Sequence, residues 1–336
     1  MPAPRAGEPD RLMVETAVSA VLNWDYDART TRLSQLYESA KLAQWNASTD
    51  IDWSLPVGFG SPLPEGSAYA LGTFRSSPLA HRGKAGWDAF RWEVQAWMVS
   101  QFLHGEQAAL VSCARLAEVL PEVEAKLCAI SQAGDEARHV EAFARYVREH
   151  VPDPYPVTEA LRALFQDALV AREWEFTALA IQCLVEPVAL AGFRLAEATF
   201  HDALIKQIVV RVARDEARHV SFGVLLLKDV LPELSDAERA HREEFVLEAI
   251  ELLRLRFLLT DVWERLEVDR AAGVRFATYD PGLAAYRRSL FSRIVPMLAQ
   301  IGLLTPTVVA RLDRLDLLDR AAARTVERMR RGGRAG

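Results

Sequence analysis

Apolar residues recur at helical spacing in nearly every long segment of this 336-residue chain between its prolines and glycines. No segment shows the sustained alternation of apolar and polar residues that is typical of a β-strand. The pattern therefore predicts an all-α protein. The expected helices cover residues 11–46, 87–119, 122–150, 157–199, 203–232, 235–268, 281–300 and 305–331.

Local signals support some of these boundaries. Ser235 and Glu238 form a capping-box pattern at the start of one predicted helix. Three prolines exclude a continuous helix over 151–157. Residues 47–86 are rich in glycine, proline and serine, so we predict a loop. A loop this long is more often a binding or covering segment than filler, and a merely mobile loop is the alternative.

The hexapeptide DEARHV occurs twice, at residues 135–140 and 215–220. Each copy has a glutamate at the same interval on the preceding predicted helix. Glu106 lies 30 residues before Glu136, and Glu186 lies 30 residues before Glu216. The chain thus contains two copies of a predicted helical hairpin with the pattern E-x29-E-x-x-H.

This interval places the two glutamates of each hairpin at one height. Residues of two antiparallel helices lie side by side only where the turn is near their midpoint. The breaks at 120–121 and 201–202 meet that condition. Within each hexapeptide, Glu and His are three positions apart and share a helix face. Six side chains are therefore expected to point toward one place: Glu106, Glu136, His139, Glu186, Glu216 and His219.

Four carboxylates in a bundle core require counter-charge, because burying them unpaired is very unfavourable. Two divalent cations supply it, with neutral imidazoles completing the shell. Oxygen and imidazole donors without thiolate favour iron or manganese. One Glu from each of two helices, with Glu-x-x-His from two others, is the di-iron carboxylate arrangement. A single Glu-x-x-His is more often a solvated helix face, but the repetition favours a dinuclear metal site.

Aspartates and arginines accompany the predicted ligands. A metal-bound histidine normally donates its second ring N–H to a carboxylate or a carbonyl. We therefore expect Asp135 and Asp215 each to orient the histidine of the opposite hairpin, with Arg138 and Arg218 anchoring these aspartates. Surface ion pairing along each helix is the alternative.

Pro187 directly follows Glu186 inside a predicted helix. Its missing amide removes the hydrogen bond to the Cys183 carbonyl and predicts a kinked or opened turn at that ligand. Such a turn would let the carboxylate change its binding mode during catalysis. An ordinary proline kink is the alternative.

Composition limits the partners and the compartment. A net charge of -6 argues against a nucleic-acid-binding surface. Three cysteines without paired spacing indicate reduced thiols. We recognise no signal peptide and no apolar run of membrane-spanning length. A soluble cytoplasmic protein with neither a nucleic-acid nor a membrane partner is expected.

These motifs resemble the ferritin-like di-iron carboxylate superfamily, in the branch shared by bacterial monooxygenase hydroxylases, acyl-carrier-protein desaturases and the small subunit of class I ribonucleotide reductase. The resemblance covers about residues 87–255 and is closest at D-E-x-R-H in both copies. It implies a four-helix bundle with additional N- and C-terminal helices. It also implies that the six residues hold two iron ions, or one manganese and one iron, and activate O2.

Some positions depart from relatives within this superfamily. The radical-generating reductase subunits carry a tyrosine where this chain has Phe143, and Tyr146 lies further along the same face. The p-aminobenzoate N-oxygenases carry an additional ligand histidine one turn before the last Glu-x-x-His, where this chain has Val212. A tyrosyl-radical subunit and a seven-ligand site are therefore both disfavoured.

Room for a substrate is expected beside the metals, between apolar walls. The expected pocket residues are Phe102, Ala109, Phe143, Leu190 and Val212. Core packing explains such residues at least as often as a pocket does. Trp97 is interpreted as structural, and His104 lies on the wrong helix face to bind the same metal as Glu106.

One structural domain in three segments is predicted: an N-terminal helix and covering loop over 1–86, the di-iron bundle over 87–233, and C-terminal helices packed on the bundle over 234–336. The expected function is an O2-activating oxygenase or oxidase that hydroxylates, desaturates or N-oxidises a small apolar or aromatic substrate. No flavin, nicotinamide or iron–sulfur motif is recognised, so electrons are expected from an external reductase or ferredoxin. A homodimer is expected.

Two other functions remain open at this point. One is a radical or ligand-binding oxidase similar to the ribonucleotide reductase small subunit, with an Fe/Fe or Mn/Fe centre. A stable tyrosyl radical would favour it. The other is an iron-binding or oxygen-protective ferritin-like protein, with slow ferroxidase turnover and no organic substrate.

Overall fold

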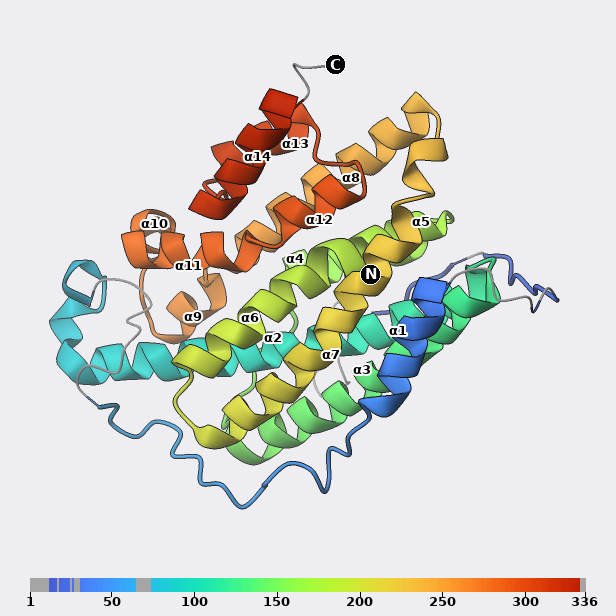
Figure 1. The fold of residues 1–336 in the computed structure, drawn as a ribbon. Helices are drawn as coiled ribbons and strands as arrows, with labels where there is room; N and C mark the ends of the chain where they lie inside the picture. The colour runs from blue at the N-terminus through green and yellow to red at the C-terminus, as the bar shows by residue number, and fades with distance from the viewer. Residues whose placement is uncertain (1–11, 17, 25, 27–30, 65–73, 333–336) are drawn as a thin grey trace.

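The computed structural model describes residues 12–16, 18–24, 26, 31–64 and 74–332, which form helices and loops without a strand. Four helical stretches make a bundle: α2 (Gly83–Val119), α3 (Val123–His150), the run ending in α6 (Glu186–Thr199), and α7 (Ala203–Leu227) (Figure 1). α2 packs along α3, and α6 packs along α7. The predicted all-α fold is confirmed.

Both hairpins turn where the spacing predicts. The first turn comprises residues 120–122 and the second comprises residues 200–202. Asp202 caps α7 by accepting a hydrogen bond from the Ile205 amide. The two turns therefore bring the paired glutamates of each hairpin to one height.

The third bundle helix is irregular beside Glu186. α5 (Trp174–Ala178) continues into a π-helical segment, Leu179–Val185, which passes directly into α6. Pro187 has no amide to donate to the Cys183 carbonyl, so regular α-helical hydrogen bonding cannot continue through this point. The predicted distortion is confirmed, and it takes the form of a widened turn of the kind often found at functional sites.

The run Trp174–Thr199 is long and apolar enough by composition to span a membrane, so the expectation that no stretch reaches that length is wrong. Its most apolar window is 94% buried inside the molecule. A helix that is apolar all round packs in a protein core, and this run fills that place in the bundle.

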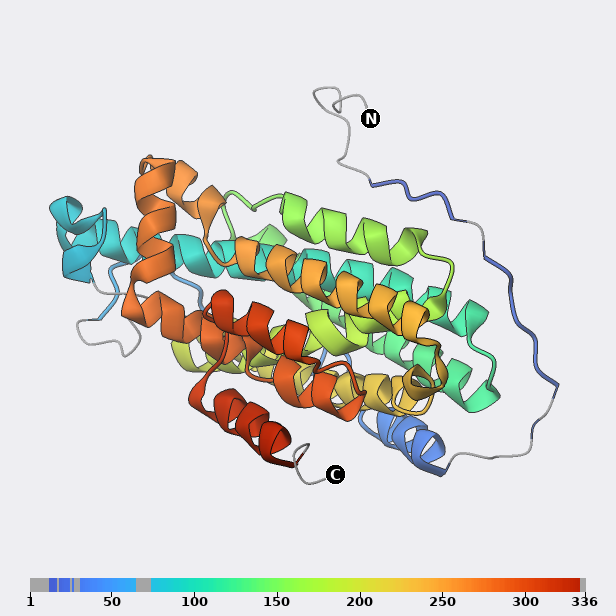
Figure 2. The same ribbon diagram turned by 90° about the horizontal axis from the view of Figure 1, so that it is seen from above.

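The prediction of a helix over 11–46 is wrong in part. Only α1 (Thr31–Leu42) is helical, and the described residues before it are not. They follow the outside of the molecule as an irregular segment (Figure 2). Helical spacing of apolar residues does not form a helix without a surface to pack against, and Leu22 and Trp24 remain exposed.

Four other predicted helices are broken in the structure. The pieces are α4 (Glu159–Val170) before α5; α8 (Asp236–Arg256) and α9 (Thr260–Arg265); α11 (Pro281–Phe291) and α12 (Ile294–Gln300); and α13 (Pro306–Arg314) and α14 (Arg320–Gly332). The helix α10 (Arg270–Tyr279) was not predicted, and α7 ends before the predicted 232. Leu259 and Asp316 adopt positive φ angles of 58° and 55° at two breaks. Neither break contains a glycine or a proline, so the apolar pattern of the sequence does not show that the helix ends there.

Additional helices cover two sides of the bundle. α1 packs on α3 and α7, while α8 to α14 lie on another side (Figure 1). α8 packs on α4 and on the π-helical segment, and α11 packs on α6. The capping box of Ser235 and Glu238 at the start of α8 is confirmed. The predicted loop over 47–86 is confirmed in its described parts up to residue 82, which contain turns and short 3-10 helices, but residues 83–86 already belong to α2.

Candidate metal centre

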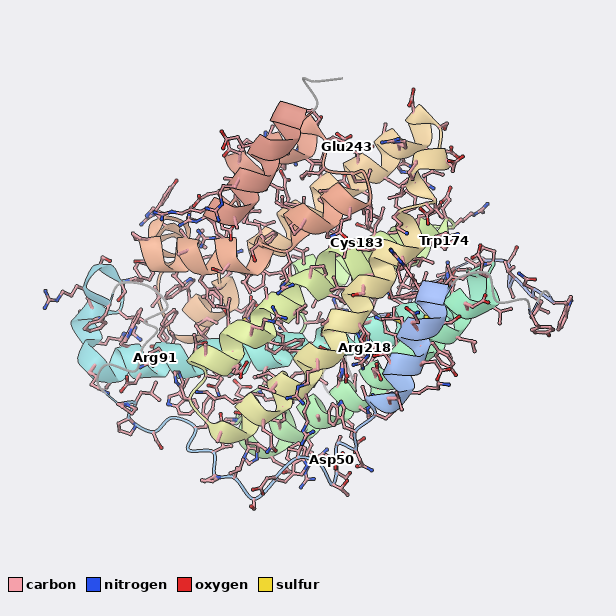
Figure 3. The ribbon with its side chains drawn as sticks, in the orientation of Figure 1. Asp50, Arg91, Trp174, Cys183, Arg218 and Glu243 are labelled. Atoms are coloured by element: carbon pink, nitrogen blue, oxygen red, sulfur yellow. The ribbon has the colours of Figure 1, made fainter. Side chains whose placement is uncertain are left out.

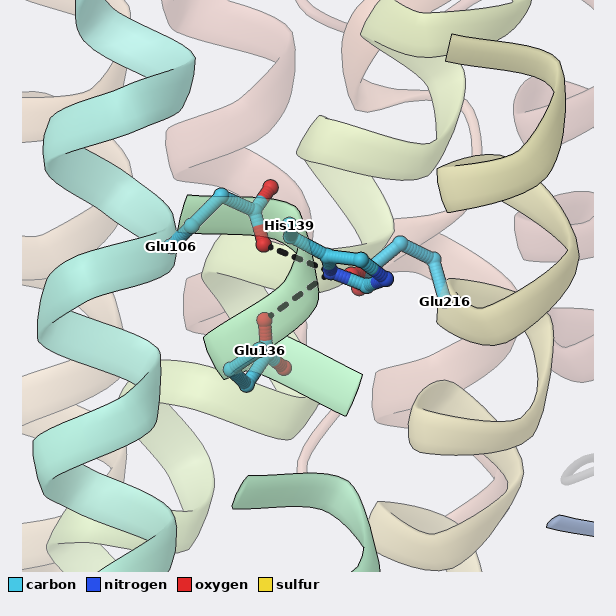
Figure 4. Close-up of side chains that lie close together, drawn as sticks. All are labelled: Glu106, Glu136, His139 and Glu216. Atoms are coloured by element: carbon cyan, nitrogen blue, oxygen red, sulfur yellow. Dashed lines mark hydrogen bonds and ion pairs between the residues drawn. The ribbon is translucent and has the colours of Figure 1, made fainter. Parts of the chain in front are cut away.

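Six side chains from the four bundle helices meet in the core, each no more than 5% exposed. They are Glu106, Glu136, His139, Glu186, Glu216 and His219. Their ligand atoms form two groups, within each of which all atoms lie within 4.8 Å of one another: Glu106, Glu136, His139 and Glu216; and Glu136, Glu186, Glu216 and His219. Figure 4 shows the first group converging from α2, α3 and α7.

Glu136 and Glu216 belong to both groups. They come from the two DEARHV copies, so the centre has an approximately two-fold pattern. Each hexapeptide supplies one shared glutamate and one histidine from the same helix face. The preceding helix of each hairpin supplies the remaining glutamate, Glu106 or Glu186.

An aspartate from the opposite hairpin lies beside each histidine. His139 Nε2 is 3.1 Å from Asp215 Oδ2, and His219 Nε2 is 3.2 Å from Asp135 Oδ2. An ionised carboxylate only accepts hydrogen bonds, so each Nε2 carries the proton and donates it. The two Nδ1 atoms face the glutamates, and they can bind a metal cation when the imidazoles are neutral.

Arg138 and Arg218 connect these aspartates. Arg138 donates to Asp135 and Arg218 donates to Asp215, while Arg218 also donates to Asp135 Oδ2 at 3.1 Å. Arg218 lies on α7 beside α1 (Figure 3). Burial alone would raise the pKa of Asp135, but the hydrogen bond and charge of His219 and the charge of Arg138 hold that pKa below its usual value. The arrangement keeps Asp135 ionised as an acceptor.

The geometry of the centre fits two metal cations. Glu136 Oε2 lies 3.2 Å from His139 Nδ1, and Glu136 Oε1 lies 3.1 Å from His219 Nδ1. At these distances nitrogen lone pairs and carboxylate oxygens repel one another, so the contacts need either a proton on Nδ1 or a metal cation between the atoms. His219 Nδ1, Glu186 Oε2 and Glu216 Oε2 are also buried without a hydrogen-bond partner among the described residues. Oxygen and imidazole donors without thiolate suit iron or manganese.

The electrostatics of the metal-free cluster agree with this. Burial, with repulsion from neighbouring carboxylates, raises the pKa of three glutamates: Glu106, Glu186 and Glu216. Glu136 differs, because contacts with His219 and His139 overcome the effect of burial and hold its pKa well below the usual value. The neighbouring carboxylates overcome the effect of burial on His139 and His219 and raise the pKa of both imidazoles well above the usual value. All four carboxylates are charged beside neutral imidazoles only when metal cations compensate them.

Gln132 is a polar residue of the centre that the sequence analysis missed. It lies one turn before Glu136 on α3, is buried, and donates from Nε2 to Glu186 and, at 3.3 Å, to Glu136. The equivalent position of the second hairpin is Val212, which is completely buried. Comparing the residue one turn before each Glu-x-x-His would have revealed this difference.

Gln44 and Trp45, just beyond α1, cover the two aspartates. Trp45 Nε1 donates to Asp215 Oδ2 at 2.7 Å, and Gln44 Nε2 donates to Asp135 Oδ1 at 3.1 Å. The covering segment was predicted to begin at residue 47, slightly too late. These contacts join residues 170 and 91 positions apart, which no local pattern reveals.

Other candidate residues have different partners. Tyr146 donates its hydroxyl to Asp202 Oδ2 at 2.8 Å, and burial raises the pKa of this hydroxyl. His104 Nε2 lies 2.9 Å from the Tyr155 carbonyl oxygen, outside the metal centre. Neither residue belongs to the two groups of potential ligands.

A cavity of about 40 Å³ lies against the centre. Its walls include the four glutamates, and Phe102, Ala109 and Trp97 line it, although Trp97 had been interpreted as structural. Three predicted pocket residues do not line it: Phe143, Leu190 and Val212. Phe143 lies behind Phe102, with 5.7 Å between the ring centroids, and the other two are buried in the core.

A family model described as p-aminobenzoate N-oxygenase AurF matches residues 114–302. The matched range begins within α2 and continues through both DEARHV copies to α12. It therefore includes every residue of the two ligand groups except Glu106. None of the curated proteins matches this chain.

Solved structures of an R2-like ligand-binding oxidase are similar to this chain. The form with an aerobically reconstituted metal cofactor after photoconversion is 19% identical, with a TM-score of 0.54 over 83% of this chain and 95% of that chain. A mutant with an anaerobically reconstituted Mn/Fe cofactor is 20% identical, with a TM-score of 0.53 over 82% of this chain and 95% of that chain. The likeness confirms the predicted ferritin-like bundle with additional helices.

Proposed function

Because this chain belongs to the p-aminobenzoate N-oxygenase AurF family, we propose that it uses O2 to N-oxidise a small aromatic amine. The chain is a di-iron oxidoreductase of the ferritin-like di-iron carboxylate superfamily. One observation supports the assignment of the metal ligands above all others: both histidines and four buried glutamates bring their ligand atoms together in two groups. Two metal cations would compensate these carboxylates with the imidazoles neutral.

The proposed ligands divide by helix. Glu106 and His139 would hold one ion, Glu186 and His219 would hold the other, and Glu136 and Glu216 belong to both groups. When bound, the iron ions supply the electron-transfer chemistry that reduces O2. The burial of all six side chains keeps bulk water away from the reacting groups.

Asp135 and Asp215 act as positioning residues. Each accepts a hydrogen bond from the Nε2 of one histidine. This contact keeps the Nδ1 of that histidine directed at the glutamates, where the metals would bind. Val212 stands where other p-aminobenzoate N-oxygenases carry a further histidine, and it cannot bind a metal. The proposed centre therefore has six protein ligands, and Gln132 supplies a hydrogen-bond donor to two of them.

The reaction needs electrons from outside the chain. Converting an amine R-NH2 and O2 into R-NHOH and water consumes two electrons and two protons. We propose that an external reductase or ferredoxin delivers the electrons, since the sequence contains no recognised flavin, nicotinamide or iron–sulfur motif. The Mn/Fe cofactor of the R2-like oxidase makes manganese the alternative metal to test at one of the two positions.

The test is turnover under 18O2 with a chemical reductant and aromatic amines that include 4-aminobenzoate. The proposal predicts a product with one labelled oxygen on nitrogen, absent in Glu136→Gln. Glu141→Gln, an exposed carboxylate on the same helix, should retain turnover. A labelled oxygen on carbon would show that the reaction is hydroxylation and not N-oxidation. A product that has lost hydrogen without gaining labelled oxygen would show that it is desaturation. Equal turnover in both variants would refute the ligand assignment.

A further inference from the structure

Arg256, the last residue of α8, lines the same cavity as the four glutamates of the metal centre. The glutamates come from within the bundle, whereas α8 packs on the outside of it, against α4 and the π-helical segment. Figure 2 shows α8 and α4 side by side over the bundle. Arg256 therefore reaches the cavity from a helix that supplies none of the proposed metal ligands.

No acidic group compensates the charge of Arg256. Among the described residues it has neither an ion pair nor a hydrogen bond, and its Nε is fully buried without a partner. Its guanidinium lies 5.7 Å from the ring centre of the neighbouring Phe257. Burial alone lowers its pKa to about 10, so it remains a cation at neutral pH.

Two other arginines of α8 have partners. Arg242 pairs with Glu175 at 3.4 Å, and Arg254, two positions before Arg256, donates to the Leu315 carbonyl at 3.1 Å. An unpaired arginine in a partly buried wall is costly unless a ligand completes it. Arg256 thus differs from Arg242 and Arg254, because its guanidinium has no polar partner among the described residues and is available to bind a ligand.

The charge balance of the cavity favours an anion. Two divalent cations offset the four carboxylates, which leaves the guanidinium of Arg256 as the uncompensated charge. A planar guanidinium with several N–H donors matches a carboxylate particularly well. The remaining wall is largely apolar and includes Trp97, Met98, Phe102 and Leu290, as a ring-shaped substrate requires.

The cavity is small in this structure. At about 40 Å³ it has room for roughly three water molecules, so an aromatic ring needs a wall residue to move. Phe102 is suited to this movement, because it lies against Gly192. A Cβ at residue 192 would come within 3.3 Å of the Phe102 ring.

We propose that Arg256 determines substrate specificity by binding the anionic group of a small aromatic substrate, whose oxidisable group then points toward the metal centre. The inference rests on the proposed function and narrows its substrate class to monoanions. It also replaces the sequence-based expectation of an apolar substrate, since a neutral molecule would leave the guanidinium without a partner.

The test compares carboxylates with their neutral amides as ligands. Binding of benzoate, 4-aminobenzoate and 3-phenylpropanoate, each beside its amide, is measured by calorimetry on anaerobic protein loaded with Fe(II). We expect wild type to prefer the carboxylate, and Arg256→Gln to weaken carboxylate binding by about 10- to 100-fold with amide binding little changed. Arg256→Lys should retain part of the preference, and Arg254→Gln should behave as wild type.

Each outcome decides the proposal. A wild type that binds no carboxylate better than its amide overturns it, as does an Arg256→Gln variant with an unchanged preference. Iron content is measured on the same samples. Less than one iron per chain would refute the proposed function, and the carboxylate preference of that protein would still decide the role of Arg256. Gly192→Ala should weaken binding of both members of each pair, because it restricts Phe102 without altering charge.

Discussion

Asp135 and Asp215 are the partners of the two imidazole Nε2 atoms. Each aspartate receives its hydrogen bond from a histidine of the opposite hairpin, at 3.2 Å and 3.1 Å. This contact determines which ring nitrogen carries the proton, and so whether the other nitrogen can bind a metal. The aspartate is therefore as necessary to the centre as the ligand that it orients.

Asp135→Asn tests this at the residue scale. The amide nitrogen of asparagine can donate to His219 Nε2, which favours the tautomer with the proton on Nδ1. We expect metal affinity to fall by about 10- to 100-fold with little change in fold. Competition with a coloured chelator under anaerobic conditions measures the affinity. Asp229→Asn, an exposed carboxylate just beyond α7, is the control. Equal affinities for the two variants would contradict the positioning role.

The sequence could predict the ligands but not Arg256. Glu136, His139 and their counterparts repeat at fixed intervals within two hairpins, so helix geometry alone brings them together. Arg256 meets the centre only because α8 returns across the bundle, and nothing near it in sequence repeats. The same reason explains why Trp45 was missed.

At the scale of elements, the π-helical segment sets the position of Glu186. The missing amide of Pro187 prevents a regular α-helix from forming through Val185 and Glu186. Pro187→Ala supplies that amide, and we expect a regular turn to rotate Glu186 away from the centre. Metal affinity should fall while thermal stability stays equal or rises.

Pro296→Ala, at an exposed position in α12, serves as the matched control because it changes a proline remote from the ligands. Metal titration and thermal unfolding are compared for both variants. An unchanged metal affinity in Pro187→Ala would mean that the widened turn has no part in holding Glu186.

The start of α8 carries a prediction about stability. Ser235 accepts from the Glu238 amide while the Glu238 side chain accepts from the Ser235 amide. Ser235→Ala should lower the free energy of unfolding by about 1 kcal/mol, measured by urea denaturation. Ser289→Ala, an exposed serine on α11, should change it by less than about 0.5 kcal/mol. A negligible loss at Ser235 would show that the cap contributes nothing to anchoring the helix of Arg256.

Prediction succeeded for elements with strong local signals and failed where packing decides. The helices at 87–119 and 122–150 are periodic and bounded by clear breaks, and the structure contains both. The break at Leu259 depends on a positive φ in a residue that ordinarily favours helix, which the sequence does not announce. The sequence thus predicted where helices occur, but it did not predict how the C-terminal part of the chain is divided into separate helices.

At the scale of the whole molecule, the metals are expected to stabilise the fold. Without them, the raised pKa values of the buried glutamates mean that the fold loses stability as the pH rises, and a chelator should lower the melting temperature. Metal at a thousand times Kd would contribute roughly 4 kcal/mol. The double variant Glu106→Gln, Glu186→Gln should be more stable than wild type when both are metal-free and the pH is above neutral, because glutamine is neutral without taking up a proton. A less stable double variant would contradict the electrostatic account.

The expected homodimer and cytoplasmic location remain predictions of the sequence. Light scattering coupled to size-exclusion chromatography tests the first. Neither property affects the argument for the metal centre, whose residues all come from one chain.

Metal analysis after anaerobic loading with Fe(II), followed by rapid mixing with O2, tests the central claim most directly. The account predicts about two irons per chain and an absorption change on mixing that Glu136→Gln abolishes and Glu141→Gln preserves. Less than one iron per chain, unaffected by any single change among the six residues, would mean that they form a buried ionic network instead of a metal centre.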